Sequence, residues 1–127
     1  MDIDFQNTFT QNLCAVAVID SQGVITKVNE KFSRLTGFSC EQLTDTRHQD
    51  LTPERWKRYE TNVIAKKVMA KGHAKYEKEI VCADGRNVPV ELDVFLLRAD
   101  SGQPVGMWAT VKPIDDLNCD LDCAIGK

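Results

Sequence analysis

Residues 28–39, which read VNEKFSRLTGFS, carry the strongest local folding signals in this chain. Asn29 is a preferred helix N-cap, and Phe32 and Leu35 follow at the spacing of a single helix face. Gly37 suits the left-handed conformation with which many helices end. The stretch therefore predicts a short helix that begins after Asn29 and stops at Gly37.

Strand and helix signals flank this helix on both sides. Upstream, residues 15–19 are apolar and rich in β-branched side chains, residues 20–23 (DSQG) favour a turn, and residues 24–28 indicate a second strand. These segments are predicted to form a hairpin. Downstream, residues 39–42 (SCEQ) match a capping box, which predicts a further helical turn with Leu43 facing inward.

A longer helix is predicted in the middle of the chain. Thr52 is expected to act as its N-cap, and Pro53 suits the first helical position. The helix is predicted to run to about Lys71 and to stop at Gly72. At a spacing of 3.6 residues per turn, its inward face comprises Trp56, Tyr59, Val63, Ile64 and Val68.

The last third of the chain is predicted to form strands. Residues 75–83 lead into the hairpin signal of residues 84–85 (DG), residues 87–98 alternate between apolar and polar positions, and residues 105–112 form the final strand. The order of elements predicts an α+β fold. We expect one five-stranded antiparallel sheet with helices on one face and a short N-terminal helix.

Composition limits the classes of protein to consider. The chain has 127 residues, of which 43% are hydrophobic and 28% are charged, and its formal net charge is -3. This predicts one domain, residues 14–113, between an N-terminal amphipathic helix (residues 1–13) and an acidic, flexible tail (residues 114–127). The negative charge argues against direct nucleic-acid binding, and no apolar run is long enough for a membrane helix. The acidic start lacks the basic region of a signal peptide, so we expect a cytoplasmic protein.

The cysteines do not form a recognisable framework. They are Cys14, Cys40, Cys82, Cys119 and Cys123. No pair has the Cys-x-x-Cys spacing, and an odd number without a signal peptide does not indicate disulfides. We expect the first three to be reduced thiols that act as small hydrophobic side chains. Cys119 and Cys123 lie in the tail, and their role stays open.

The order of these segments resembles the PAS (Per-ARNT-Sim) sensory domain family. Residues 29–38 resemble the N-x-x-F-x-x-x-T-G-[FY] core of that family, and residues 50–54 (DLTPE) resemble the segment that opens its long helix. Residues 84–86 (DGR) and residues 102–111 match its last two hairpins. The resemblance covers about residues 13–113 and implies a cavity between helices and sheet that holds a ligand or cofactor. It also implies a sensory or interaction module rather than an enzyme.

The periodicity of the segments indicates which side chains face that cavity. The candidate ligand-binding residues are Phe32, Leu35, Leu43, Leu51, Trp56, Tyr59, Val63, Val90, Leu92, Val94, Met107 and Ala109. Trp56, Tyr59 and Thr36 are the candidate polar groups of the pocket. The alternative is that all of these residues simply fill the core of a structural dimerisation module without a ligand.

The residues at the positions that a cofactor requires limit the choice of cofactor. Light-oxygen-voltage members carry a reactive cysteine in an N-C-R-F-L-Q segment. Counted from residues 36–38, that position holds His48, and Cys40 lies eight residues earlier. Cysteinyl-flavin photochemistry is therefore not expected. The cofactor stays unknown: a small apolar ligand, a non-covalent flavin or heme remain alternatives, with His48 as the lesser candidate heme ligand, and no other metal site is predicted.

Large apolar side chains also lie on the opposite face of the predicted sheet and need a cover. With the stripe of the N-terminal helix, they form a candidate homodimer interface comprising Phe5, Phe9, Leu13, Phe95, Leu97 and Trp108. The alternative is a monomer whose helix folds back onto the sheet. Basic residues along and after the long helix are read as a solvated face; they are Arg55, Lys57, Arg58, Lys66, Lys67, Lys71, Lys75 and Lys78.

These observations predict a signalling module that binds a small molecule and relays a change to a partner or an output domain, such as a kinase, cyclase or transcription regulator. No Ser/His/Asp order, phosphate-binding loop or H-E-x-x-H motif is present. A small α+β enzyme would instead require a polar cluster inside the cleft. The character of the cavity lining therefore separates the two classes.

Overall fold

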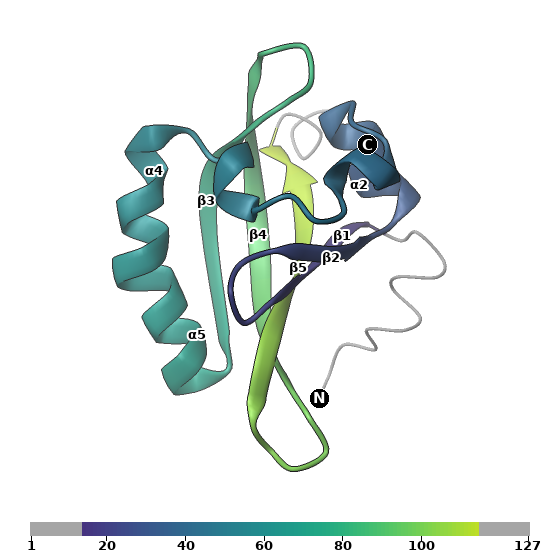
Figure 1. Cartoon of the computed structure of the whole chain (residues 1–127). Helices are drawn as coiled ribbons and strands as arrows, with labels where there is room; N and C mark the ends of the chain where they lie inside the picture. Colours follow the sequence, from purple (N-terminus) through teal and green to yellow (C-terminus); the bar gives the residue numbers. More distant parts are fainter. Residues whose placement is uncertain (1–13, 115–127) are drawn as a thin grey trace.

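The computed structural model describes residues 14–114. Its five strands are β1 (Ala15–Asp20), β2 (Ile25–Val28), β3 (His73–Val81), β4 (Asn87–Arg98) and β5 (Pro104–Pro113). They form one antiparallel sheet in the order β2-β1-β5-β4-β3 (Figure 1). The predicted α+β fold is confirmed. The predicted helix of residues 1–13, including Phe5, Phe9 and Leu13, and the tail after residue 114 lie outside the described residues.

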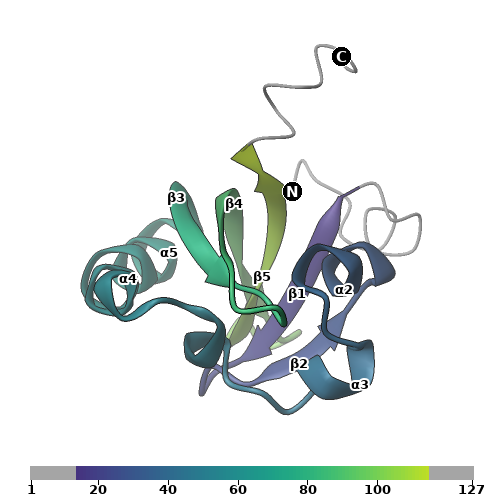
Figure 2. The ribbon, with the colours of Figure 1, turned by 90° about the horizontal axis from the view of Figure 1, so that it is seen from above.

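The helical elements lie between β2 and β3 in the chain. They are α2 (Glu30–Thr36), α3 (Cys40–Leu43), the 3-10 helix η1 (His48–Leu51), α4 (Glu54–Tyr59), the π-helical segment η2 (Glu60–Ile64) and α5 (Ala65–Lys71). Viewed from above, α4 and α5 lie beside β3, whereas α2 and α3 lie beside β1 and β2 (Figure 2). None of the helices within residues 14–114 is long and apolar enough to cross a membrane.

The capping residues fix α2 and α3 as the sequence predicts. The Asn29 side-chain oxygen accepts from Phe32 N at 3.0 Å, and Gly37 ends α2 in the left-handed conformation with φ 83°. Asn29 also ties α2 to the sheet, because its oxygen accepts from Val16 N at 3.0 Å and its amide donates to the Cys14 carbonyl at 2.7 Å. The capping box that opens α3 is present.

The core lies between the sheet and the helices. The inward face of β4 supplies Val90, Leu92 and Val94, all buried, as the alternation predicts. Phe32 reaches this core from α2, and Val68 reaches it from α5. Because both ends of the helical layer contact the same core, the space between them is bounded by apolar side chains.

Candidate functional site

A cavity of about 590 Å³ lies between the sheet and the helical layer. Its lining is mostly apolar and comes from both layers. Half of the predicted ligand-binding residues are in this lining, namely Phe32, Leu51, Leu92, Val94, Met107 and Ala109. The cavity therefore lies next to half of the side chains that the sequence assigned to it.

The other predicted residues lie elsewhere. Leu43 and Val90 are fully buried in the core, and Leu35 packs against it, but none of them lines the cavity. Tyr59 and Val63 are 40% and 46% exposed and do not line the cavity, although the Tyr59 ring lies 6.2 Å from that of Tyr76 on β3. Trp56 and the proposed polar group Thr36 are also absent from the lining.

The register of the long helix explains the error. At η2 the helix takes the wider π-helical turn, in which Ala65 N bonds to the Glu60 carbonyl five residues earlier. The buried residues of the helix are consequently Glu60, Ile64 and Val68, at a regular spacing of four. The predicted inward face did not include Glu60, because a glutamate in an amphipathic helix is expected to face solvent.

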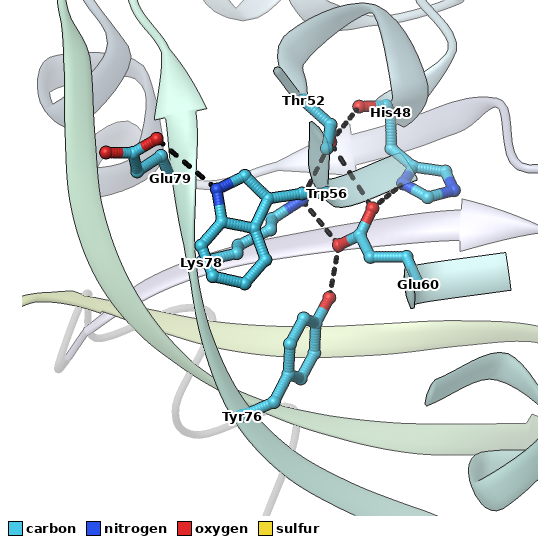
Figure 3. A network of polar contacts seen from close by, with 7 residues as sticks. All are labelled: His48, Thr52, Trp56, Glu60, Tyr76, Lys78 and Glu79. Carbon is cyan, nitrogen blue, oxygen red and sulfur yellow. Dashed lines mark hydrogen bonds and ion pairs between the residues drawn. The ribbon is translucent and has the colours of Figure 1, made fainter. Parts of the chain in front are cut away.

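Glu60 belongs to a polar cluster that reaches the cavity wall, which we call the Glu60 cluster: the buried residues Glu60, Lys78, Tyr76 and Thr52 and the half-buried His48 (Figure 3). Lys78 Nζ lies 2.6 Å from Glu60 Oε2, and the Tyr76 hydroxyl donates to the same oxygen. Both members of the ion pair are buried, with 6% of each residue exposed. The prediction that Lys78 lies on a solvated face is therefore wrong.

Thr52 and His48 complete the cluster. The Thr52 hydroxyl accepts a hydrogen bond from Lys78 Nζ at 2.8 Å and lies 3.2 Å from the His48 carbonyl and 3.4 Å from Glu60 Oε1. Thr52 does not cap α4, whose N-cap is Pro53 with no side-chain hydrogen bond. The predicted capping role is wrong because the hydroxyl is engaged in the cluster.

Burial is the largest cause of the pKa shifts in the Glu60 cluster. Desolvation lowers the pKa of Lys78, and the adjacent Glu60 carboxylate opposes that shift. Desolvation likewise lowers the pKa of His48, again opposed by Glu60, so the ring is neutral at pH 7. Burial and Glu60 both raise the pKa of Tyr76, which therefore keeps its proton. The Lys78 and Glu60 side chains are in direct contact as an ion pair.

The polar end of Trp56 is engaged outside this wall. Its Nε1 donates to Glu79 Oε1 at 3.3 Å, and Arg55 pairs with the same carboxylate. Hydrogen bonds from Arg55 and Trp56 lower the pKa of Glu79. The indole N–H that was a candidate polar group of the pocket is therefore satisfied by a strand residue.

The family profile described as PAS domain matches residues 13–114, which is most of the chain. The chain belongs to the PAS domain family. A comparison with curated proteins gave no match.

Solved structures share the fold of this PAS domain. A PAS domain from Colwellia psychrerythraea has 22% identity and a TM-score of 0.80, over 86% of this chain and 92% of that one. A light-oxygen-voltage domain studied with a flavin analogue has 15% identity and a TM-score of 0.74, over 89% and 86%. The PAS domain of a LuxR-family transcriptional regulator from Burkholderia thailandensis, in complex with ethanol, has 16% identity and a TM-score of 0.71, over 89% and 99%.

The residues of this PAS domain constrain the cofactors that its family implies. His48, which stands at the reactive cysteine position by sequence counting, does line the cavity, whereas Cys14, Cys40 and Cys82 do not. Its Nδ1 faces Glu60 Oε1 at 4.0 Å, and its Cδ2–Nε2 edge lies against Gly23, within 3.4 Å of where a β-carbon would stand. Within residues 14–114, no three His, Cys, Asp or Glu side chains group as a metal site.

The outer face of the sheet carries a row of stacked rings. Phe95 stacks on Trp108 with centroids 4.7 Å apart, and His73 stacks on Phe95 at 4.6 Å. Phe95 and Leu97 are partly exposed, while Trp108 is 1% exposed within this single chain. Of the predicted interface residues in the described part, Phe95 and Leu97 are therefore the ones that a partner can reach.

Proposed function

We propose that this PAS domain is a sensory module that binds a small molecule in its cavity and relays the bound state to a partner or output domain. The observation that carries this proposal is the cavity of about 590 Å³ with an apolar lining and the Glu60 cluster at one wall. Binding sites for small molecules have volumes of roughly 300–1,000 Å³ and combine apolar walls with a few polar groups. The cavity has both properties.

The same cluster bears on the enzyme alternative, because the lining is not purely apolar. We propose binding rather than catalysis, since Lys78, Tyr76 and Glu60 Oε2 are engaged with one another. The Lys78 ammonium and the Tyr76 hydroxyl both donate to Glu60 Oε2. A general base needs a free acceptor and a pKa near the working pH, whereas the pKa of Tyr76 is raised and its proton is held by Glu60. Turnover of a bound molecule would contradict this part of the proposal.

We further propose that the module acts in the cytoplasm as a homodimer or beside an output domain. The free thiols Cys14, Cys40 and Cys82 suit a reducing compartment. Phe95 and Leu97 on the outer sheet face suit an isologous contact. The LuxR-family regulator shows a PAS domain of similar fold within a protein that has an output.

The test begins with the protein as purified from its native host or after reconstitution with host extract. We expect a co-purifying small molecule in the solvent extract, identified by mass spectrometry, and absorption bands if that molecule is a flavin. Where none co-purifies, 2-acetylnaphthalene serves as a neutral apolar probe, with binding followed by protein-observed NMR. A protein that carries no molecule and does not bind the probe would overturn the proposal.

A matched pair of variants on α5 tests whether the probe binds in the cavity. Ala65 lines the cavity, whereas Ala70 is exposed on the same helix. Ala65→Phe should fill the cavity and abolish probe binding, while Ala70→Phe should bind as the wild type does. Circular dichroism verifies that both variants are folded. Equal binding by the two variants would show that the probe sits elsewhere.

A further inference from the structure

One oxygen of the buried Glu60 carboxylate lacks a full hydrogen-bond donor in the described part of the chain. Oε2 accepts from both Lys78 and Tyr76, but Oε1 has only the Thr52 hydroxyl at 3.4 Å. That hydroxyl has a single proton, and the His48 carbonyl competes for it at 3.2 Å. His48 Nδ1, at 4.0 Å from Oε1, is too distant for a hydrogen bond. Oε1 is therefore a buried acceptor with capacity for a further N–H or O–H.

Lys78 offers the complementary capacity at the same place. An ammonium has three N–H donors. Two of them are directed to Glu60 Oε2 at 2.6 Å and Thr52 Oγ1 at 2.8 Å. One donor remains, on a nitrogen that touches the same carboxylate. Glu60 and Lys78 are both lining residues of the cavity, so this acceptor and this donor belong to adjacent side chains at its wall.

The charged residues of the cavity lining restrict the charge of a ligand that binds there. Glu60 and Lys78 cancel each other, and burial keeps the His48 ring neutral. The other charged residue in the lining, Asp20, accepts hydrogen bonds from Gln22 N at 2.8 Å and Val24 N at 3.0 Å in its own turn. An anion entering the cavity would lose its hydration without finding an unpaired cation in the lining, and a cation would find only Asp20, whose carboxylate is held by its own turn; both cases are costly. An uncharged ligand meets no such penalty.

We propose that the ligand of this cavity is an uncharged molecule with an apolar body and an adjacent donor–acceptor pair, of the kind found in a primary amide, lactam, imide or ureide. Its N–H donates to Glu60 Oε1, and its carbonyl accepts from Lys78 Nζ. This inference rests on the proposed function, because it assigns the ligand class of the same cavity. It also gives the Glu60 cluster a role in selecting the ligand.

Three probes of nearly equal shape test the ligand class. 2-Naphthamide has a neighbouring donor and acceptor, 2-acetylnaphthalene has the acceptor alone, and 2-naphthoate is an anion. We expect 2-naphthamide to bind at least about tenfold more tightly than either of the others, because a hydrogen bond to a charged group is stronger than a neutral one. Titration by NMR or calorimetry at pH 7 gives the three dissociation constants. Equal affinities would overturn the ligand class but leave the proposed function intact, whereas binding of none, by a protein that carries no molecule when purified, would overturn both.

Variants test whether the preference for 2-naphthamide depends on the Glu60 cluster. Glu60→Gln with Lys78→Met removes both charges together, so neither remains buried alone, and should reduce the amide preference to within about threefold. Glu79→Gln is the control, because Glu79 pairs with Arg55 outside the lining and should keep the preference. A preference that persists in the double variant would overturn the proposal. If the double variant does not fold, intermolecular NOEs between the amide protons of bound 2-naphthamide and the Glu60 and Lys78 side chains decide it, and their absence counts against it.

Discussion

The two ends of the helical layer, α2–α3 and α4–η2–α5, pack on the same sheet but are specified in different ways. At the first end, each boundary coincides with a capping residue, and Asn29 and Ser39 make the hydrogen bonds that their positions predict. At the second end, the helix changes register at η2, and its buried face includes the charged residue Glu60. Local capping signals determine the first end, whereas a long-range ion pair determines the second.

At the second end, a buried polar contact coincides with a change of helical register. An uninterrupted helix would place its inward residues as the apolar pattern of Trp56, Tyr59 and Val63 predicts. In the observed register Ile64 and Val68 keep the apolar contact, and Glu60 meets Lys78 on β3. The helix register set by the π-helical turn at η2 is therefore the one that places Glu60 next to Lys78. Removing the ion pair should affect this end of the molecule alone.

The largest effect is expected from breaking that ion pair. Lys78→Met leaves the Glu60 carboxylate buried without its counter-charge, and we expect the free energy of unfolding to fall by about 3–5 kcal/mol. Glu60→Gln with Lys78→Met should recover most of this loss, because no unpaired charge remains and the introduced glutamine amide can still accept from Tyr76. Urea denaturation of the two variants and the wild type measures the difference. Equal losses in the single and double variants would show that the ion pair does not govern this end.

The next prediction separates the two possible registers of the long helix. Ile64→Ala removes a side chain that is 5% exposed, so we expect a loss of about 2–5 kcal/mol. Val63→Ala is the matched neighbour, 46% exposed, and should change stability by less than about 0.5 kcal/mol. Urea denaturation again gives both values. The opposite order would mean that the helix runs through η2 without a π-helical turn.

Much of the fold was predictable because its signals are local. The alternation along β4 assigned Val90, Leu92 and Val94 to the inner face and Phe95 to the outer face, since side chains alternate across a strand. The turn residues placed the hairpins, with boundary errors of one or two residues in β1, β2, β3 and β5. The same alternation predicted the strand side of the cavity, in Leu92, Met107 and Ala109.

The polar wall of the cavity was missed because its signal is split between two distant elements. Glu60 by itself reads as a solvent-facing helical residue. Lys78, however, lies in phase with the buried Tyr76 and Ile80 along β3, which should have marked it as an inward lysine in need of a carboxylate. That pattern indicates a partner but does not name it. Only the packing of η2 against β3 identifies the partner as Glu60.

A third prediction concerns the well-specified end. Asn29→Ala removes the N-cap of α2 and leaves Val16 N and the Cys14 carbonyl without their side-chain partner. We expect a loss of about 2–4 kcal/mol, the sum of a lost cap and of buried groups left unsatisfied. Asn29→Asp keeps the acceptor for Phe32 N and Val16 N but not the donor to Cys14, and should lose less. A loss below about 1 kcal/mol for Asn29→Ala in urea denaturation would show that capping does not determine this end.

The smallest effect is expected at His48, which opens η1 between the two ends. Burial lowers the pKa of the His48 ring. The folded protein therefore protonates this ring at lower pH than the unfolded chain does, in which histidines have a pKa of about 6.5. Between these two pKa values the unfolded state binds more protons, and falling pH therefore favours unfolding. The unfolding free energy of the wild type should fall more steeply between pH 7.5 and 5.5 than that of His48→Gln, in urea titrations at matched ionic strength.

The comparison with His48→Gln isolates one ring, because the other titrating groups, including the pair of His73 and Asp93, are common to both proteins. Lys78 and Arg47 disfavour a charged His48 together with burial, whereas Glu60 and Asp50 favour it. A wild type that loses no more stability in acid than the variant would mean that the attraction to Glu60 outweighs burial. Protonated His48 would then compete with Lys78 for Glu60, and the Glu60 cluster at the second end would not be fixed by a single ion pair.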